Sequence, residues 1–277
     1  MDRTLYLNEN KGLRVFRDGP SIWIKEDGKA GKRIPARLVN RVVIIGNLRL
    51  EAGVITLFTD NDIPVTFFDH RGNTVAVAMP YNHQLPRHYE EQKVFLETED
   101  NIERFKRWLY AKRKEIQLGV VKRISKRVAG LFISKGFREK DYREFIEEFK
   151  PSNHPKTDER FKVVSMTISN LFREMVMGCI VKADLDPHLG ILYRRRNFGF
   201  ALDICHILEA ESELQTIQFF KSAKENGYMV KEQVGWSVTK EGMKDIIHRF
   251  ENRRRQLLDA VEGLIDEVFE LIRELRR

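Results

Sequence analysis

Cysteine is almost absent from this sequence of 277 residues, which contains only Cys179 and Cys205. Both lie in apolar runs with helical spacing, so the chain cannot carry the disulfide framework that is typical of small secreted domains. No Cys-x-x-Cys pair is present either, which argues against a structural zinc site. We therefore expect two buried thiols in a reducing compartment, and a protein of the cytoplasm.

Long apolar runs and several catalytic motifs are also missing. The first ten residues, MDRTLYLNEN, contain no apolar segment of the kind found in secretion signals, and no uncharged apolar run approaches the length that spans a membrane. The sequence has no P-loop, no Gly-x-Gly-x-x-Gly motif and no Ser-His-Asp order. We therefore set aside nucleotide binding and acyl transfer, and expect no membrane partner.

Positive charge is what the sequence has in excess. Lys and Arg together number 49 against 41 for Asp and Glu, which gives a formal net charge of +8 at pH 7. Such an excess favours a polyanionic partner, with nucleic acid first and an acidic membrane surface second. The alternative is a well-solvated surface with surplus lysines.

The order of local patterns predicts an α+β protein with two domains. Residues 1–80 alternate β-branched and aromatic runs with turn signals such as Asp18–Gly19 and Asp27–Gly28, as hairpins require. Residues 81–88 contain a proline and read as a linker, and residues 89–277 are predominantly helical in pattern. We expect a small, β-sandwich-like N-terminal domain with one short helix in residues 51–64, followed by a larger all-α domain.

Within the helical part, two segments stand out. Residues 161–184 are apolar nearly all round, which is typical of a buried central helix. A terminal amphipathic helix is expected to start after Thr239, since apolar residues recur at helical spacing from there towards the end of the sequence.

Several short stretches occur in an order that resembles the CRISPR-associated protein one (Cas-one) family, the integrases that acquire new spacers. In the N-terminal part these are Leu5–Leu7, Ile34–Pro35, the strand VVIIG and the segment DIPVTFFDHRG at residues 62–72. In the helical part they are LDPHLG at residues 185–190 and FALDICHILE at residues 200–209. Each piece is unspecific alone, but the ordered set covers most of the chain.

The resemblance implies a fold, partners and a chemistry. Such proteins have an N-terminal β-domain, here residues 1–80, through which they form homodimers. Their helical domain, here residues 89–277, is of the DNA-binding and catalytic type, and in most systems they pair with the small protein Cas-two. They cut or join DNA strands with a divalent metal, Mg²⁺ or Mn²⁺, which activates one oxygen and stabilises another.

The metal ligands of the family do not carry over intact. The family's histidine falls on Tyr193, the first acid of its Asp-x-x-acid pair on Asp203, and the second on His206. Its glutamate should lie between residues 120 and 140, where Leu131 to Ser134 match the setting and Glu139 is out of register.

Tyr193, Asp203 and His206 are thus the expected catalytic positions, and Asp203 and His206 the only candidate metal ligands. One carboxylate and a neutral phenol are a poor donor set for Mg²⁺ or Mn²⁺. The pair could still bind a transition metal with help from another segment. The simpler interpretation is that Asp203 accepts a hydrogen bond from a buried histidine or a backbone group, while Glu209 and Glu211 are solvated.

Arginine clusters supply the candidate DNA contacts. Arg194, Arg195 and Arg196 follow the LDPHLG turn, and we expect them to contact DNA phosphates. Residues 121–127 and Arg253–Arg255 form further basic helical clusters, each either a DNA contact or a solvated face. His154 is most simply a loop histidine.

Three functions remain open at this stage. The first is a Cas-one-type DNA-binding protein of the spacer acquisition machinery, with its metal-dependent activity lost or weakened and, if the activity is lost, with no metal. The second is an active metal-dependent endonuclease or integrase that uses a rearranged site around Asp203 and His206. The third, should the resemblance mislead, is a basic nucleic-acid-binding protein without catalysis.

Overall fold

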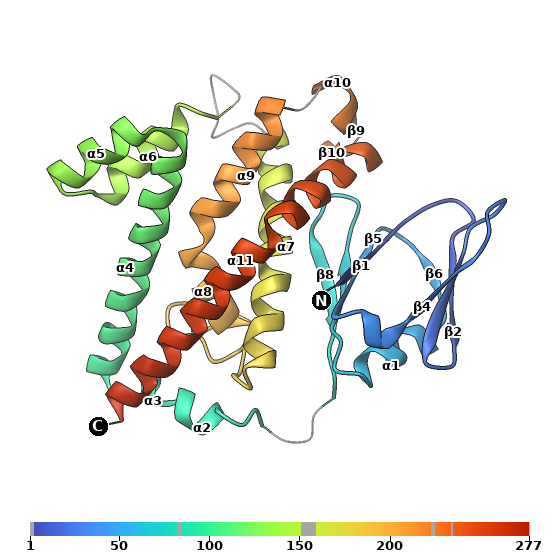
Figure 1. The fold of residues 1–277 in the computed structure, drawn as a ribbon, viewed down its shortest axis with the longest axis horizontal. Helices are drawn as coiled ribbons and strands as arrows, with labels where there is room; N and C mark the ends of the chain where they lie inside the picture. Colours follow the sequence, from blue (N-terminus) through green and yellow to red (C-terminus); the bar gives the residue numbers. More distant parts are fainter. Residues whose placement is uncertain (1–2, 82–84, 151–158, 223–224, 234, 277) are drawn as a thin grey trace. The chain divides into compact units, whose positions relative to one another are not determined.

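The computed structural model describes residues 3–81, 85–150, 159–222, 225–233 and 235–276. The chain divides into two compact units, Met1–Gln84 and Leu85–Arg277 (Figure 1). Strands dominate the first unit and helices the second, as the sequence predicts.

The first unit contains two four-stranded sheets. One has the order β1-β5-β7-β8, with β1 and β7 parallel to the central β5 and with β8 antiparallel to β7. The other has the order β4-β3-β2-β6. The bounds are β1 (Thr4–Asn8), β2 (Arg14–Asp18), β3 (Ser21–Lys25), β4 (Lys32–Pro35), β5 (Arg41–Ile45), β6 (Arg49–Leu50), β7 (Val65–Phe68) and β8 (Thr74–Ala78).

Both sheets of this unit share one hydrophobic core. Ile22 of β3, Ile44 of β5 and Phe58 of α1 (Ala52–Thr59) belong to the same buried cluster. The predicted Asp-Gly turns are present, because Gly19 and Gly28 have φ values of +59° and +77° that favour glycine. A short 3₁₀ turn, η1 (Ala36–Leu38), follows β4.

The second unit is built around the long helices α4, α7, α9 and α11. In Figure 1, α4, α9 and α7 run alongside one another and α11 crosses them obliquely. The bounds are α2 (Tyr89–Gln92), α3 (Val94–Glu97), α4 (Glu99–Ile124), α5 (Lys126–Lys135), α6 (Glu139–Glu147), α7 (Glu159–Lys182), α8 (Gly199–Ile207), α9 (Glu209–Ser222), α10 (Glu225–Tyr228) and α11 (Lys240–Leu275).

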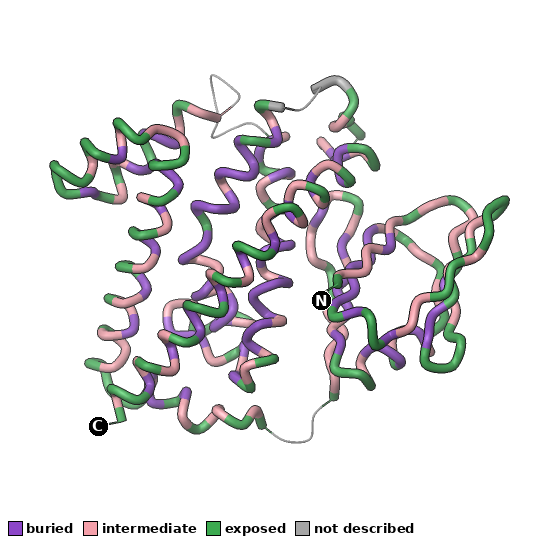
Figure 2. The backbone as a smooth tube through the Cα atoms, viewed as in Figure 1, coloured by how far each residue is buried: buried purple, intermediate pink, exposed green. Residues whose placement is uncertain are grey.

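Helix α7 is the central helix that the sequence predicts. It contacts α8, α9 and α11 and is buried along most of its length (Figure 2). By length and composition it could cross a membrane, but 67% of the relevant 18-residue window is buried inside the unit. Its apolar character is therefore explained by packing against the surrounding helices.

Side-chain caps set the starts of three helices. Thr98, Ser125 and Thr239 each accept a hydrogen bond from a backbone N–H in the first turn of α4, α5 and α11. The expected start after Thr239 is confirmed. Ser125 also divides the basic stretch 121–127 between the end of α4 and the start of α5, so it is not one continuous helical cluster.

One element departs from the all-α expectation for this unit. Strands β9 (Met229–Glu232) and β10 (Gly235–Val238) form an antiparallel hairpin just before α11. Val230, Trp236 and Val238 have the β-branched or aromatic side chains that favour strands. Gly235 has a φ of +125°, which a non-glycine residue rarely adopts.

Candidate functional site

The site is built on the turn between α7 and α8. Asp186 orders this turn, because its carboxylate accepts the N–H of His188 at 2.7 Å and its backbone exchanges two hydrogen bonds with the buried side chain of Gln92. Gly190 and Gly199 then bring two backbone segments into direct contact. A Cβ on Gly190 would lie 2.5 Å from the carbonyl carbon of Gly199, so both positions require glycine.

Phe198 starts α8 in a strained conformation. It has a φ of +57°, which is uncommon for any residue other than glycine. Its N–H donates to Nδ1 of His188 at 3.2 Å, and the two rings lie 4.4 Å apart. These contacts hold the loop 191–197 against the first turn of α8, and strain of this kind is often found at functional sites.

Asp203 anchors the same loop from beneath. It is fully buried, and its two carboxylate oxygens accept the backbone N–H groups of Ile191 at 2.6 Å, Leu192 at 3.3 Å and Tyr193 at 3.0 Å. Burial raises the pKa of Asp203 to about 6, against the opposing effect of these hydrogen bonds. The interpretation that Asp203 accepts a backbone hydrogen bond is therefore confirmed.

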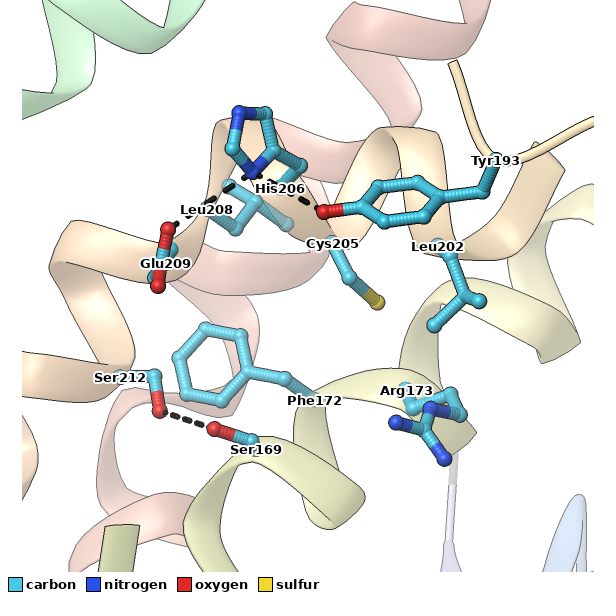
Figure 3. A pocket seen from close by; sticks show the side chains of 10 residues that line it. All are labelled: Ser169, Phe172, Arg173, Tyr193, Leu202, Cys205, His206, Leu208, Glu209 and Ser212. Atoms are coloured by element: carbon cyan, nitrogen blue, oxygen red, sulfur yellow. Dashed lines mark hydrogen bonds and ion pairs between the residues drawn. The ribbon is translucent and has the colours of Figure 1, made fainter. Parts of the chain in front are cut away.

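Tyr193 and His206 do come together, as the sequence predicts. The Tyr193 hydroxyl lies 3.5 Å from Nδ1 of His206, and their rings meet edge to face at 6.1 Å (Figure 3). Burial and the neighbouring Arg113 guanidinium lower the pKa of His206, so the imidazole is neutral at pH 7. Burial and Glu209 raise the pKa of the Tyr193 phenol, which keeps it protonated.

Arg113 of α4 is the central cation of this site. Its side chain is only 9% exposed and pairs with Glu209 at 2.6 Å and Glu139 at 3.2 Å. One guanidinium N–H donates to the backbone carbonyl of His206, and the same nitrogen lies 3.5 Å from Nδ1 of His206. Gln117, one helical turn beyond Arg113, donates to Glu139 at 2.7 Å. We call Arg113, Gln117, Glu139, His206 and Glu209 the Arg113 network.

Arg113 is not among the site residues that the sequence predicts, although the sequence contains a signal for it. Phe105, Leu109, Arg113 and Gln117 lie four residues apart and are all buried, so the last two continue an apolar stripe with polar side chains. Buried charges need partners. An arginine within such a stripe therefore indicates a paired internal charge.

The donor set does not fit a divalent metal. Both oxygens of Asp203 already accept backbone N–H groups, and the Arg113 guanidinium is paired with Glu209 and lies next to Nδ1 of His206. Among the described residues, no three His, Cys, Asp or Glu side chains form a group that could hold a metal ion. Glu139 is out of register with the glutamate of the family's metal site. It nevertheless belongs to this site, because it forms an ion pair with Arg113.

The expectation that Glu209 and Glu211 are solvated is wrong for Glu211. Its side chain is 12% exposed and pairs with Arg123 of α4 and, at 3.3 Å, with Arg253 of α11. Glu209 is half-exposed, yet it forms the ion pair with Arg113. Buried or half-buried acids find partners that are distant in sequence, which the local pattern cannot reveal. Arg123 and Arg253 belong to the two basic helical clusters that the sequence leaves as either DNA contacts or solvated faces. Both arginines instead form ion pairs with Glu211.

The three loop arginines differ from these paired cations. Arg194, Arg195 and Arg196 are all exposed, and within the described part of the chain their side chains make no hydrogen bond or ion pair.

The two cysteines are free thiols. Cys179 is buried, and burial raises the pKa of the Cys205 thiol to about 12. His154 lies outside the described residues.

Comparisons with known proteins point to one family. Residues 5–150 match the protein-family model described as "CRISPR associated protein Cas1". No curated protein matches the sequence.

Three solved structures illustrate the likeness in fold. A Cas1 protein from Thermotoga maritima is 16% identical, with a TM-score of 0.76 over 99% of this chain and 97% of that one. A TtCas1–DNA complex is 14% identical, with a TM-score of 0.68 over 98% and 92%. A Cas6-RT-Cas1–Cas2 complex is 12% identical, with a TM-score of 0.70 over 97% of this chain and 35% of that one.

Proposed function

The chain belongs to the Cas1 family of CRISPR-associated proteins, and from this premise we propose that it is a DNA-binding subunit of the spacer-acquisition machinery. The family is generally metal-dependent. In this member we infer that the metal-dependent cutting and joining of strands is lost or weakened. A rearranged active site around Asp203 and His206 is the competing function, and the experiment below separates the two.

The single observation that carries the loss of metal chemistry is the position of Arg113. A guanidinium paired with Glu139 and Glu209 supplies inside the site a positive charge that cannot be removed at neutral pH. A divalent cation would have to displace this guanidinium, because Arg113 already holds the carboxylates of Glu139 and Glu209 that the metal would need.

DNA binding is supported by charge and by fold. The chain carries a net charge of +8, and Arg194–Arg196 lie exposed beside the site. These arginines would contact phosphates, which position a protein on DNA without reading its sequence. A solved structure of similar fold is a complex of TtCas1 with DNA.

We also propose three features of its setting in the cell. Cas2 is a candidate partner, since one similar solved structure is a complex that contains Cas1 and Cas2. Residues 1–80 would form the homodimer contact, as the family resemblance implies. The cytoplasm, a reducing compartment, would suit its two free thiols.

The test combines metal binding with DNA chemistry. Mn²⁺ binding, followed by electron paramagnetic resonance, should be absent at this site in the wild type. In Arg113→Met the affinity for Mn²⁺ should be at least tenfold higher than in the wild type, because the Arg113 guanidinium no longer occupies Glu139, Glu209 and His206. Arg107→Met is the matched control, since Arg107 is an exposed arginine of the same helix and should leave Mn²⁺ binding unchanged.

Incubation of the wild type with branched and linear DNA and Mn²⁺ completes the test. We expect binding without cleavage or joining. Strand cleavage by the wild type would overturn the proposal, and its loss in His206→Ala at an unchanged Tm would assign the activity to the rearranged site.

A further inference from the structure

A cavity of about 190 Å³ lies next to the Arg113 network, between α7 and the pair α8 and α9. Figure 3 shows the side chains that line it, with Arg173 on one side and Tyr193 and His206 on the other. Sites for drug-sized ligands have volumes of about 300–1,000 Å³. This cavity therefore suits a small group and not a whole nucleotide.

Arg173 brings a positive charge to this cavity. Its Nε atom is buried and has no hydrogen-bond partner, and within the described residues its guanidinium forms no ion pair. Glu209, the acid that also lines the cavity, is already paired with Arg113. Buried polar groups are almost always hydrogen-bonded, so an orphaned guanidinium nitrogen beside a cavity indicates a missing acceptor.

Hydroxyl groups supply further donors to the same space. The Oγ atoms of Ser169 and Ser212 lie 2.9 Å apart and share one hydrogen bond, which leaves one of the two O–H groups free to donate to a third partner. The Tyr193 hydroxyl can also donate. A guanidinium and two hydroxyls form a donor set suited to the oxygens of a phosphate group.

The remaining walls strengthen such an interaction. Phe172, Leu202 and Leu208 are apolar, and charge-assisted hydrogen bonds are stronger where the surroundings are apolar. No second negative charge comes from Cys205, because burial raises the pKa of its thiol to about 12. His206 is neutral at pH 7, so Arg173 supplies the positive charge among the residues that line the cavity.

We propose that this cavity is a metal-independent phosphate site, in which Arg173 binds the phosphate through its guanidinium, while Tyr193 and one member of the Ser169–Ser212 pair donate through their hydroxyls. The group is either the terminal phosphate of a DNA strand or free phosphate. The inference rests on the proposed DNA-binding function only for the first of these sources.

The first arm of the test uses inorganic phosphate in the presence of EDTA, with binding measured by calorimetry and by the shift in Tm. Phosphate should bind the wild type and Arg107→Met equally, and bind Arg173→Met at least tenfold more weakly. Equal affinity for Arg173→Met and the wild type would overturn the proposal. Should Arg173→Met fail to fold, Tyr193→Phe gives the same test, with a several-fold loss expected because its hydroxyl donor is removed, and unchanged affinity would overturn the proposal.

The second arm uses short DNA strands with a terminal phosphate or a terminal hydroxyl. Tighter binding of the phosphorylated strand, lost in Arg173→Met, assigns the site to strand ends. Equal binding of both strands, together with a positive first arm, assigns it to free phosphate. Strands that do not bind at all while phosphate still binds would refute the proposed DNA-binding function but leave the phosphate site standing.

Discussion

Arg113 and Asp203 show how single residues balance charge in this site. Arg113 is neutralised by Glu139 and Glu209, and Asp203 is stabilised by three backbone N–H groups. A buried charge without such partners is costly. Each of these side chains is therefore committed to an internal contact, which gives Asp203 a structural role in holding the loop.

Replacement of Asp203 by asparagine tests this role. Asp203→Asn should lower the free energy of unfolding at pH 7 by about 2 kcal/mol, since an amide NH₂ would face a backbone donor. Equilibrium urea unfolding measures the loss, and hydrogen exchange should show faster opening at Ile191–Tyr193.

The stabilities of the wild type and Asp203→Asn should depend differently on pH. Burial raises the pKa of Asp203 from 3.8 to about 6, so the folded protein holds a proton that the unfolded chain releases within this window. The stability contributed by Asp203 should be fully present below pH 3.8 and fall as the pH rises through 6. The difference in the free energy of unfolding between wild type and Asp203→Asn should therefore become smaller from pH 4 to pH 7. A difference that becomes larger over this range would contradict the raised pKa of Asp203.

Local sequence explains part of the site at this scale. Tyr193 and His206 were assigned to one site through the family resemblance, and only a short turn and the first turns of one helix separate them. Arg113 and His206 are 93 residues apart in sequence, and no local periodicity connects them. Their contact follows from the packing of α4 against α8.

At the scale of elements, the turn before α8 depends on two backbones that touch. Gly190 and Gly199 allow this approach, and Phe198 accepts a left-handed conformation where α8 begins. The loop that carries Tyr193 and Arg194–Arg196 is placed by this contact, so a change in the turn should be felt in both stability and DNA binding.

A methyl group at Gly199 tests the contact. In Gly199→Ala the new Cβ would lie 2.6 Å from the carbonyl oxygen of Tyr193, and overpacking of this kind costs about 1–3 kcal/mol of unfolding free energy. Gly119→Ala is the control, because Gly119 lies exposed on α4 with no atom within 4 Å of the added Cβ. The control should be stabilised by about 0.5–1 kcal/mol. An unchanged free energy of unfolding in Gly199→Ala would show that the two backbone segments can move apart.

On the scale of the whole molecule, which has a net charge of +8, some cations are paired internally and others are exposed. Arg113, Arg123 and Arg253 are neutralised internally by acids from distant elements. Arg194–Arg196 are exposed and unpaired within the described residues. The cations available to a polyanion are therefore fewer than composition suggests, and three of them lie together on the loop of the site.

Salt dependence of DNA binding tests which cations contact phosphate. Each phosphate neutralised on duplex DNA adds about 0.9 to the slope of log K against log salt. Replacement of Arg194–Arg196 by alanine should make this slope shallower by about 2–3 and weaken binding at low salt, as measured by fluorescence anisotropy. A control removes three exposed cations of α11 with the same change in net charge, and should alter the slope less: Lys240, Lys244 and Arg273. Equal effects of both triple variants would mean that net charge alone drives binding.

Local patterns in the chain were enough to predict the two parts of the fold, the hairpin turns and the capped start of α11. These features depend on residues that are near neighbours along the sequence, so spacing and turn chemistry reveal them. The frame of a Cas1-type site came from the family resemblance. The tertiary structure alone decided the Arg113 network, the Glu211 ion pairs and the unpartnered Nε of Arg173. They depend on which side chains meet across helices, and burial then forces each charge to find a partner or, as at Arg173, leaves it to be supplied by a ligand.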